Sequence, residues 1–264
     1  MRNAEIDFDE LYQLPSDWKW HSLEDLISVP KRDIVDGPFG SNLKASEYLD
    51  EGVPVARLQN INRNEFIHKN IKFISKKKAE MLSRHSFHSG DILITKLGDP
   101  LGKACIVPET IPHGIIVADI VRVRTTNGMD KRYLTYAINS PFIARQFEKH
   151  IKGTTRPRVN LGIIRKLPIP VAPKKQQPLI VAEIEKQFSR LDEAVTGLKR
   201  VKGNLKRYKA AVLKAAVEGK LTEEWRKAHP NVERGEHLLK RILAERKKKW
   251  EEKNPGKKYK EPAA

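Results

Sequence analysis

The chain has 264 residues, and its 51 lysines and arginines against 33 aspartates and glutamates give a formal net charge of +18. It has no run of about 18 apolar residues and no apolar segment near its start, which argues against a membrane protein and a secretory signal; its single cysteine, Cys105, excludes a disulfide framework and fits a reducing cytoplasm. The charge favours a polyanionic partner such as nucleic acid, although a membrane surface or a solubilising protein surface would also fit.

Positive charge is concentrated in the last third of the chain. Residues 1–173 hold 26 basic and 20 acidic residues, whereas residues 174–264 hold 25 and 13. This shift predicts three parts: a mixed α/β (α+β) domain over 1–173, a long helix over 174–219, and short helices with a basic tail over 220–264.

The first part alternates short apolar runs with Gly, Pro and Asn, which is typical of strands in a mixed α/β domain. The expected strands are 53–58, 66–74, 91–95, 103–107 and 115–124. Helical apolar spacing predicts helices over 76–84 and 132–150, the second interrupted at Pro141. Residues 167–171 contain two prolines and must be extended, so the domain is expected to end close to residue 173.

The clearest element is a helix over 178–218, with Pro178 at its first position and Gly219 available as its C-terminal cap. Apolar residues recur every three or four positions and form a near-heptad stripe, comprising Phe188, Leu191, Val195, Leu198, Val201, Leu205, Tyr208 and Val212. At about 1.5 Å per residue the helix is roughly 60 Å long, more than one small domain covers. The stripe therefore needs a partner helix, either the last helix of the same chain or the same helix of a second copy.

Two shorter helices are expected beyond Gly219. Thr222 is placed to cap the first of them, and residues 236–253 form the second. The second helix has a basic face and an apolar face, the latter comprising Leu238, Leu239, Ile242, Leu243 and Trp250. The predicted fold class is thus an α/β (α+β) domain followed by a long coiled-coil-forming helix and a shorter basic helix.

Two segments resemble catalytic or metal-binding motifs but lack residues or spacings that those motifs require. Residues 98–103 look like a phosphate-binding loop, but only three residues separate the glycines where four are needed, and Ala104 replaces the hydroxyl residue that binds magnesium. His85 and His88 have the spacing of metal ligands, but no further cluster joins them. The sequence therefore predicts neither a catalytic residue nor a metal site on this chain.

Three polar loops do carry side chains suited to nucleic acid. Residues 152–160 combine three cations, two hydroxyls and an asparagine; residues 57–63 combine two arginines with three amides; residues 37–44 form a glycine-containing polar loop. Arginine can bond guanine bidentately, asparagine can bond adenine, and lysine or threonine can hold phosphate. Solvated surface loops and simple turns remain the alternative interpretation.

Several segments, taken in order, resemble the specificity subunit of type I restriction-modification systems. They are LPSDWKWHSLEDL (14–26), GPFGSNLKASEY (37–48), GVPVARLQNI (52–61), SGDILITKLGDPLGKACIVPE (89–109) and KGTTRPRVNLGIIRKLPIPVAP (152–173). The long helix and the stretch GKLTEEWRKAHP continue the match. The chain departs from the family pattern at Gln176, where the family usually has Glu, and it holds one recognition domain where the family usually has two.

The resemblance implies a cytoplasmic, non-catalytic subunit that reads double-stranded DNA with its target recognition domain and spaces such domains with a coiled coil. Modification subunits would use S-adenosylmethionine, and restriction subunits would use ATP and magnesium, so no cofactor is expected on this chain. A half-length subunit with one recognition domain is expected to form a homodimer through the long helix. The other interpretations are a basic coiled-coil scaffold that binds only partner subunits, a truncated subunit without its own specificity, and an unaided methyltransferase or nuclease.

The candidate DNA-binding residues come from these loops and from the segment 89–109. They are Ser41, Lys44, Arg57, Gln59, Asn60, Asn62, Arg63, Lys96, Lys103, Lys152, Thr154, Thr155, Arg156, Arg158 and Asn160.

Overall fold

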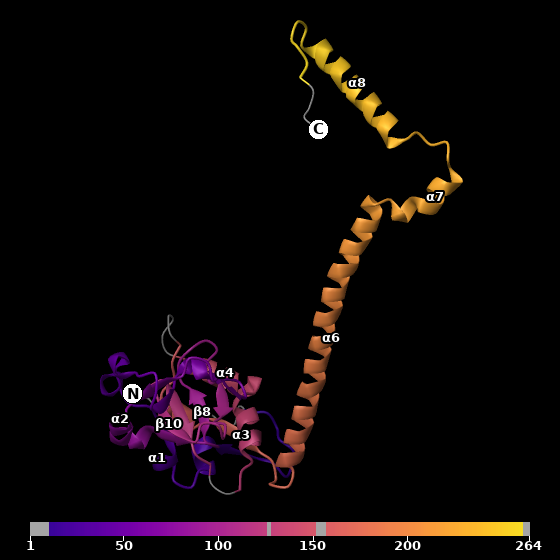
Figure 1. The fold of residues 1–264 in the computed structure, drawn as a ribbon. Helices are drawn as coiled ribbons and strands as arrows, with labels where there is room; N and C mark the ends of the chain where they lie inside the picture. The colour runs from indigo at the N-terminus through magenta and orange to yellow at the C-terminus, as the bar shows by residue number, and fades with distance from the viewer. Residues whose placement is uncertain (1–10, 126–127, 152–156, 261–264) are drawn as a thin grey trace. The chain divides into compact units, whose positions relative to one another are not determined.

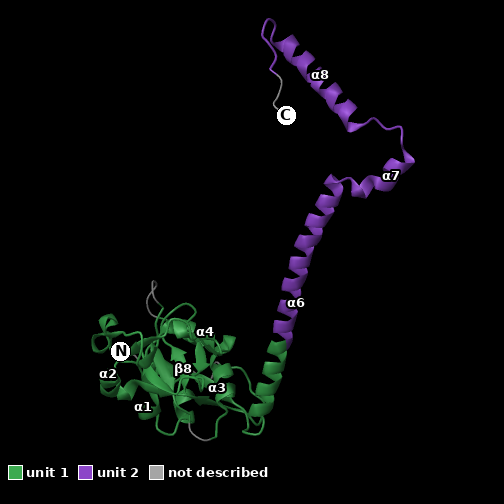
Figure 2. Cartoon of the chain, in the orientation of Figure 1, with its two compact units in different colours: residues 1–189 green, residues 190–264 purple. Residues whose placement is uncertain are grey.

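The computed structural model describes residues 11–125, 128–151 and 157–260. Contacts divide the chain into two compact units, residues 1–189 and residues 190–264, coloured separately in Figure 2. The first unit contains all the strands of the described residues, and Figure 1 shows them with helices α3 and α4 beside them.

The strands of the first unit are short and lie in two four-stranded sheets and two two-stranded ones. One large sheet has the order β6-β3-β10-β7 and the other β2-β11-β8-β9, while β1 pairs with β12 and β4 with β5. Their bounds are β1 Lys19–Ser22, β2 Ile34–Asp36, β3 Val53–Ala56, β4 Ile61–Asn62, β5 Glu65–Phe66, β6 Lys72–Ile74, β7 Ser86–His88, β8 Ile92–Thr95, β9 Ala104–Ile106, β10 His113–Ile116, β11 Ile120–Val123 and β12 Pro168–Val171.

The helices predicted over 76–84 and 132–150 are present in the first unit, and the structure adds two short helices that were not predicted, α1 and α5. The break at Pro141 is confirmed, since α3 ends at Ile138 and α4 begins at Pro141, where the Ser140 side chain accepts a hydrogen bond from the Ile143 amide. The bounds are α1 Pro30–Asp33, α2 Lys76–Met81, α3 Lys131–Ile138, α4 Pro141–Lys149, α5 Leu161–Arg165, α6 Gln177–Val217, α7 Glu223–Ala228 and α8 Gly235–Lys253.

Two of the predicted strands are wrong because the chain changes sheets within them. Residues 115–124 are divided between β10 and β11, which belong to different large sheets, and the Ile120 amide donates to the Val117 carbonyl in the turn between them. Residues 66–74 are likewise divided between β5 and β6, with Asn70 in the left-handed conformation at φ 57°. An apolar run has the same pattern whether or not it turns, so the sequence could not place these breaks.

The sheet β2-β11-β8-β9 is buried on both faces. Ile94 and Val121 point to one face, where they pack with Leu134, Ile143 and Phe147 from α3 and α4. A second, equally buried cluster on the other face contains Leu93, Cys105, Ile116 and Ile120. Burial raises the pKa of the Cys105 thiol to about 12, so this cysteine is an unreactive core residue.

The start of the first unit is joined to the start of α6. β1 pairs antiparallel with β12, and the Trp18 indole donates to the Gln176 amide oxygen at 3.1 Å. The Gln176 amide nitrogen in turn donates to an Asp17 carboxylate oxygen at 2.6 Å. Glutamate at this position would lack the amide donor and repel Asp17, so glutamine suits this contact at the start of α6.

Helix α6 confirms the predicted long helix and its cap, since Gly219 adopts a left-handed φ of 71°. Along it only Gln177 and Val181 are buried, and much of the stripe is open, with Leu198 69% and Leu205 61% exposed. Thr222 is the N-cap residue of α7, as predicted, but its hydroxyl donates to the Gly219 carbonyl and accepts from Arg226 and makes no capping hydrogen bond to the helix. Phe188 at the start of the stripe contacts the Tyr136 ring, whereas the stripe beyond it, from Leu191 to Tyr208, is exposed in the part of the chain that the structure describes.

Gly102 lies where the loop after β8 packs under α4. Its φ is +74°, and a Cβ placed on it would lie 2.2 Å from Cε2 of the buried Phe147 ring. Gly98 in the same loop has φ +121° but meets nothing within 4 Å. We expect Gly102→Ala to lower the free energy of unfolding by about 1–3 kcal/mol more than Gly98→Ala, because only Gly102→Ala adds a steric clash to the backbone strain. Urea unfolding of the two variants measures this difference, and equal losses would contradict the packing argument.

Candidate nucleic-acid interface

A hollow of about 720 Å³ brings three of the predicted residues together. Lys96, Arg158 and Asn160 line it with Asp36, His150 and the start of α5. These residues come from segments far apart in the chain, because the segment after α4 is hydrogen-bonded to the loop after β8. The Val159 amide donates to the Lys96 carbonyl at 3.1 Å, and the Gly98 amide donates to the Pro157 carbonyl at 3.2 Å.

Asn160 has a structural function within this hollow. Its side-chain oxygen accepts a hydrogen bond from the Ile163 amide at 2.9 Å and thereby caps the start of α5. The side chain is exposed, so its amide nitrogen still faces solvent as a donor.

The cations of the hollow are paired with carboxylates that the sequence analysis did not single out. Lys96 Nζ lies 2.5 Å from an Asp36 carboxylate oxygen, and Arg158 Nη2 lies 3.1 Å from Asp119 Oδ1. The Lys96 amide also donates to the Asp119 carbonyl, which links the two pairs. Donors and acceptors therefore stand side by side, and carboxylates can accept from the exocyclic amine of cytosine. No local motif in the sequence marks these two carboxylates.

Residues 57–70 form a turn that uses most of its predicted DNA-binding side chains internally. Asn60 is fully buried; its amide nitrogen donates to the carbonyls of Ile67 and Lys69. The Arg57 guanidinium and the Gln59 amide both donate to the Asn70 carbonyl, at 2.6 and 3.2 Å. The prediction that Asn60 reads bases is wrong, because a base cannot reach it, and Arg57 and Gln59 stabilise the turn.

Asn62 and Arg63 are exposed on the β4–β5 hairpin. The hairpin is held in place from outside, since the Asn139 amide donates to the Asn64 side-chain oxygen at 2.7 Å. Asn139 also accepts from the Ala104 amide at 2.9 Å, which joins the end of α3 to β9. The hairpin tip therefore presents a rigid pair of polar side chains.

The other predicted residues are distributed as follows. Ser41 and Lys44 are exposed, and Lys103 is half-buried at the start of β9. Lys152, Thr154, Thr155 and Arg156 lie outside the described residues. Over the described ranges, no group of three His, Cys, Asp or Glu side chains could hold a metal ion. Nor does any helix within those ranges have the length and apolar character needed to cross a membrane.

Two solved structures share this fold. One, reported under complex assembly and conformational transition of the type I R-M system, superposes with a TM-score of 0.59 at 18% identity and covers 78% of this chain and 47% of its own. The other is the HsdS subunit from Thermoanaerobacter tengcongensis, with a TM-score of 0.50 and 20% identity over 78% of this chain and 46% of its own.

The sequence relatives agree with the fold. The type I restriction enzyme EcoKI specificity subunit of Escherichia coli strain K12 is 24% identical over 241 residues, 86% of this chain and 52% of the relative. The chain thus spans about half the length of the curated relatives it matches. The sequence profile of the type I restriction modification DNA specificity domain matches residues 15–201, most of the chain. The chain therefore belongs to the family of type I restriction-modification DNA specificity domains.

Proposed function

We propose that this chain is the DNA-recognition component of a type I restriction-modification complex. The observation that supports this function best is the hollow in which Lys96, Arg158 and Asn160 stand beside Asp36 and Asp119. Both hydrogen-bond donors and acceptors for base edges then lie on one rigid scaffold, as direct readout requires. The net charge of the whole chain, +18, supports binding to the phosphate backbone of DNA.

The partner subunits would carry out the chemical reactions of the complex. We propose that modification subunits supply the S-adenosylmethionine-dependent methylation and that a restriction subunit supplies ATP-driven and magnesium-dependent cleavage. This chain would act without a cofactor, in the cytoplasm, by placing its partners on a chosen sequence.

Binding to DNA would rearrange the two ion pairs. The Arg158 side chain is 60% exposed, so its guanidinium can leave Asp119 at little cost and bond guanine N7 and O6. Asp119 would then be free to accept from a cytosine amine. On a wrong sequence Arg158 and Asp119 would separate without gaining a base as a new partner. The ion pair of the free chain therefore also reduces binding to wrong sequences.

The test of base reading is Arg158→Ala. A bidentate contact to guanine accounts for about 1–3 kcal/mol, so affinity for the target should fall roughly 5–150-fold and discrimination at one base pair should be lost. Arg145 on α4 is the matched control, since it is exposed, does not line this hollow and has no ion pair within the described residues. Arg145→Ala should lose little affinity and no specificity. Competition binding with single-base variants of the target measures both quantities, and unchanged specificity in Arg158→Ala would remove this residue from the interface.

The open stripe on α6 supports a second part of the proposal, a two-fold dimer. Leu198, Leu205 and Tyr208 are each more than 60% exposed in the single chain, although a near-heptad stripe is the pattern that packs against another helix. An antiparallel pairing of two α6 helices would relate two identical recognition domains by a two-fold axis. The target would then be a two-part palindrome whose half-sites lie about one helical turn of DNA apart, roughly 10 base pairs, or a multiple of it.

The competing function is a scaffold that binds only partner subunits. It is favoured by one observation, that Lys96 and Arg158 are already neutralised by carboxylates in the free chain. A gel shift with competitor DNA separates the two functions. A recognition subunit should keep its target bound in a large excess of unrelated DNA, whereas a scaffold should bind no sequence in preference.

A further inference from the structure

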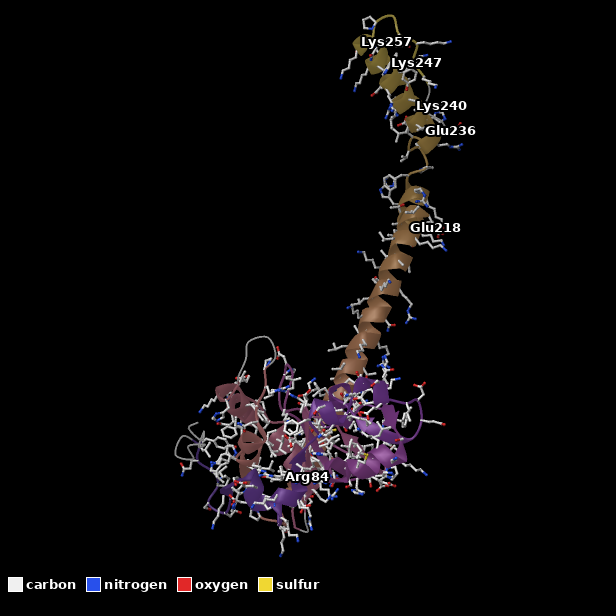
Figure 3. The ribbon with its side chains drawn as sticks, turned by 90° about the vertical axis from the view of Figure 1, so that its left-hand side faces the viewer. Arg84, Glu218, Glu236, Lys240, Lys247 and Lys257 are labelled. Carbon is white, nitrogen blue, oxygen red and sulfur yellow. The ribbon has the colours of Figure 1, made fainter. Side chains whose placement is uncertain are left out.

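A second hollow, of about 380 Å³, is lined by cations and shares no residue with the first. Its charged side chains come from α1, from the 3-10 turn before β7, and from β11 and the residue that follows it; they are Lys31, Arg32, Arg84, Arg122 and Arg124. We call these five residues the arginine pocket. Figure 3 labels Arg84, which is exposed.

The pocket lies where the two large sheets meet. Arg122 stands opposite Val35 on β2 and Leu93 on β8, so its side chain shares the face of Leu93, which packs toward the second sheet. There its guanidinium donates to the Ser86 carbonyl of β7 at 2.9 Å and also to the Arg32 carbonyl. Arg122 is thereby fixed between the sheets with only 3% of its surface exposed.

The pocket holds more positive charge than its carboxylates can neutralise. Asp33 pairs with Arg32 and Asp91 pairs with Arg124, each at 2.7 Å. No carboxylate of the described residues forms an ion pair with Lys31, Arg84 or Arg122. The neutral ring of His88 completes the surroundings, with its Nδ1 2.7 Å from Arg124 Nη2. Burial, together with the charge of Arg124, lowers the pKa of His88, which favours the neutral ring, so this histidine adds no further positive charge.

Arg122 is the most deeply buried cation of the arginine pocket. Burial lowers the pKa of its guanidinium, and the charge of Arg124 lowers it further. Its Nε is buried and has no hydrogen-bond partner. A ligand in the hollow cannot reach this buried atom, but Lys31 and Arg84 line the same hollow and form no ion pair with a carboxylate of the described residues, so an anion with several acceptor oxygens would neutralise them.

We propose that the arginine pocket binds the phosphate group of a phosphate ester. Phosphate carries close to two negative charges and presents oxygens that match the planar fork of arginine. The volume of the hollow is sufficient for a phosphate with part of its ester, and the phosphate belongs either to the DNA backbone or to a free phosphate ester. The DNA source rests on the proposed function, whereas the phosphate site itself does not.

The first experiment uses inorganic phosphate as the probe. It is titrated into the full chain at constant ionic strength and followed by isothermal calorimetry, for the unmodified chain, Arg84→Ala and the control Arg145→Ala. Arg84 makes no ion pair in the described structure and is exposed, so its removal should leave the fold intact. Loss of one charge-assisted contact should weaken phosphate binding about tenfold in Arg84→Ala and leave Arg145→Ala unchanged.

The second experiment identifies the source of the phosphate. The salt dependence of binding to a duplex without the target sequence is measured for the same three proteins. If the phosphate belongs to the DNA backbone, Arg84→Ala should reduce the slope of log affinity against log salt by about one, relative to Arg145→Ala. If the slope is unchanged while phosphate binding falls, the ligand is a free phosphate ester.

Two results would overturn the proposal. One is an unmodified chain that does not bind phosphate, and the other is equal phosphate affinity in Arg84→Ala and Arg145→Ala. Neither result affects base reading, which is tested at Arg158 in a different hollow. Conversely, loss of specificity in Arg158→Ala with intact phosphate binding would separate the two sites.

Discussion

Affinity of the purified chain for a DNA duplex is expected to fall by about 10³–10⁵ between 50 and 200 mM salt. The reason is counterion release: a protein that neutralises about 6–10 phosphates liberates the ions condensed on them, and this gain disappears as salt rises. A net charge of +18 with 51 lysines and arginines supplies enough cations for that number of contacts. Fluorescence anisotropy over a salt series measures the slope.

The salt series also separates backbone contacts from base contacts. Arg63, exposed on the β4–β5 hairpin, is a candidate for phosphate contact. Arg63→Ala should weaken target and non-target duplexes by the same factor and reduce the slope by about one. Arg145→Ala on α4 is the control that removes an equal charge elsewhere. A flat salt response of the unmodified chain would contradict phosphate-driven binding altogether.

The double substitution Leu198→Glu and Leu205→Glu is expected to convert a dimer of this chain into a monomer. Both side chains are more than 60% exposed in the single chain, so the substitutions remove nothing from its own core. In a helix pair, burying each leucine contributes about 1.5–3 kcal/mol, and burying a glutamate charge in its place is strongly unfavourable. The dimer dissociation constant should therefore rise at least a thousandfold, roughly 4 kcal/mol.

Sedimentation of the chain, alone and with its modification subunit, measures this change. Arg200→Glu with Lys206→Glu is the matched control, because it introduces the same residues on the same helix away from the stripe and should leave a dimer intact. The unfolding transition of the recognition domain should be the same in both variants, since all four positions lie beyond residue 189. A chain that is monomeric before any substitution, or an asymmetric methylated target, would exclude the two-fold dimer.

Local sequence signals were sufficient for the longer helices, whereas the short helices α1 and α5 were not predicted. Pro141 ended one helix and began another, and Gly219 capped α6, because each acts through its own backbone and needs no distant partner. The stripe on α6 and the family motifs, which lie in chain order, were equally readable. Recognition of the family therefore required no knowledge of packing.

Only the tertiary structure decided which side chains share a site. Lys96 meets Asp36 across 60 residues of sequence, and Arg158 meets Asp119 across 39. Such pairs depend on how loops from separate strands are hydrogen-bonded to one another, and periodicity carries no information about that. The same limit hid the sheet change between β10 and β11, because an apolar run looks alike in one strand or two.

Burial was the other property that the sequence did not reveal. Asn60 looked like a base-reading amide, but it lies inside a turn where backbone carbonyls satisfy it. Arg122 looked like one basic residue of an apolar strand, yet it lies between two sheets with its Nε unsatisfied. The sequence by itself determined the longer helices, the charge and the family, because these follow from local pattern. The two hollows arise only when distant segments pack, since their charge balance is set by which carboxylates the fold brings near each cation.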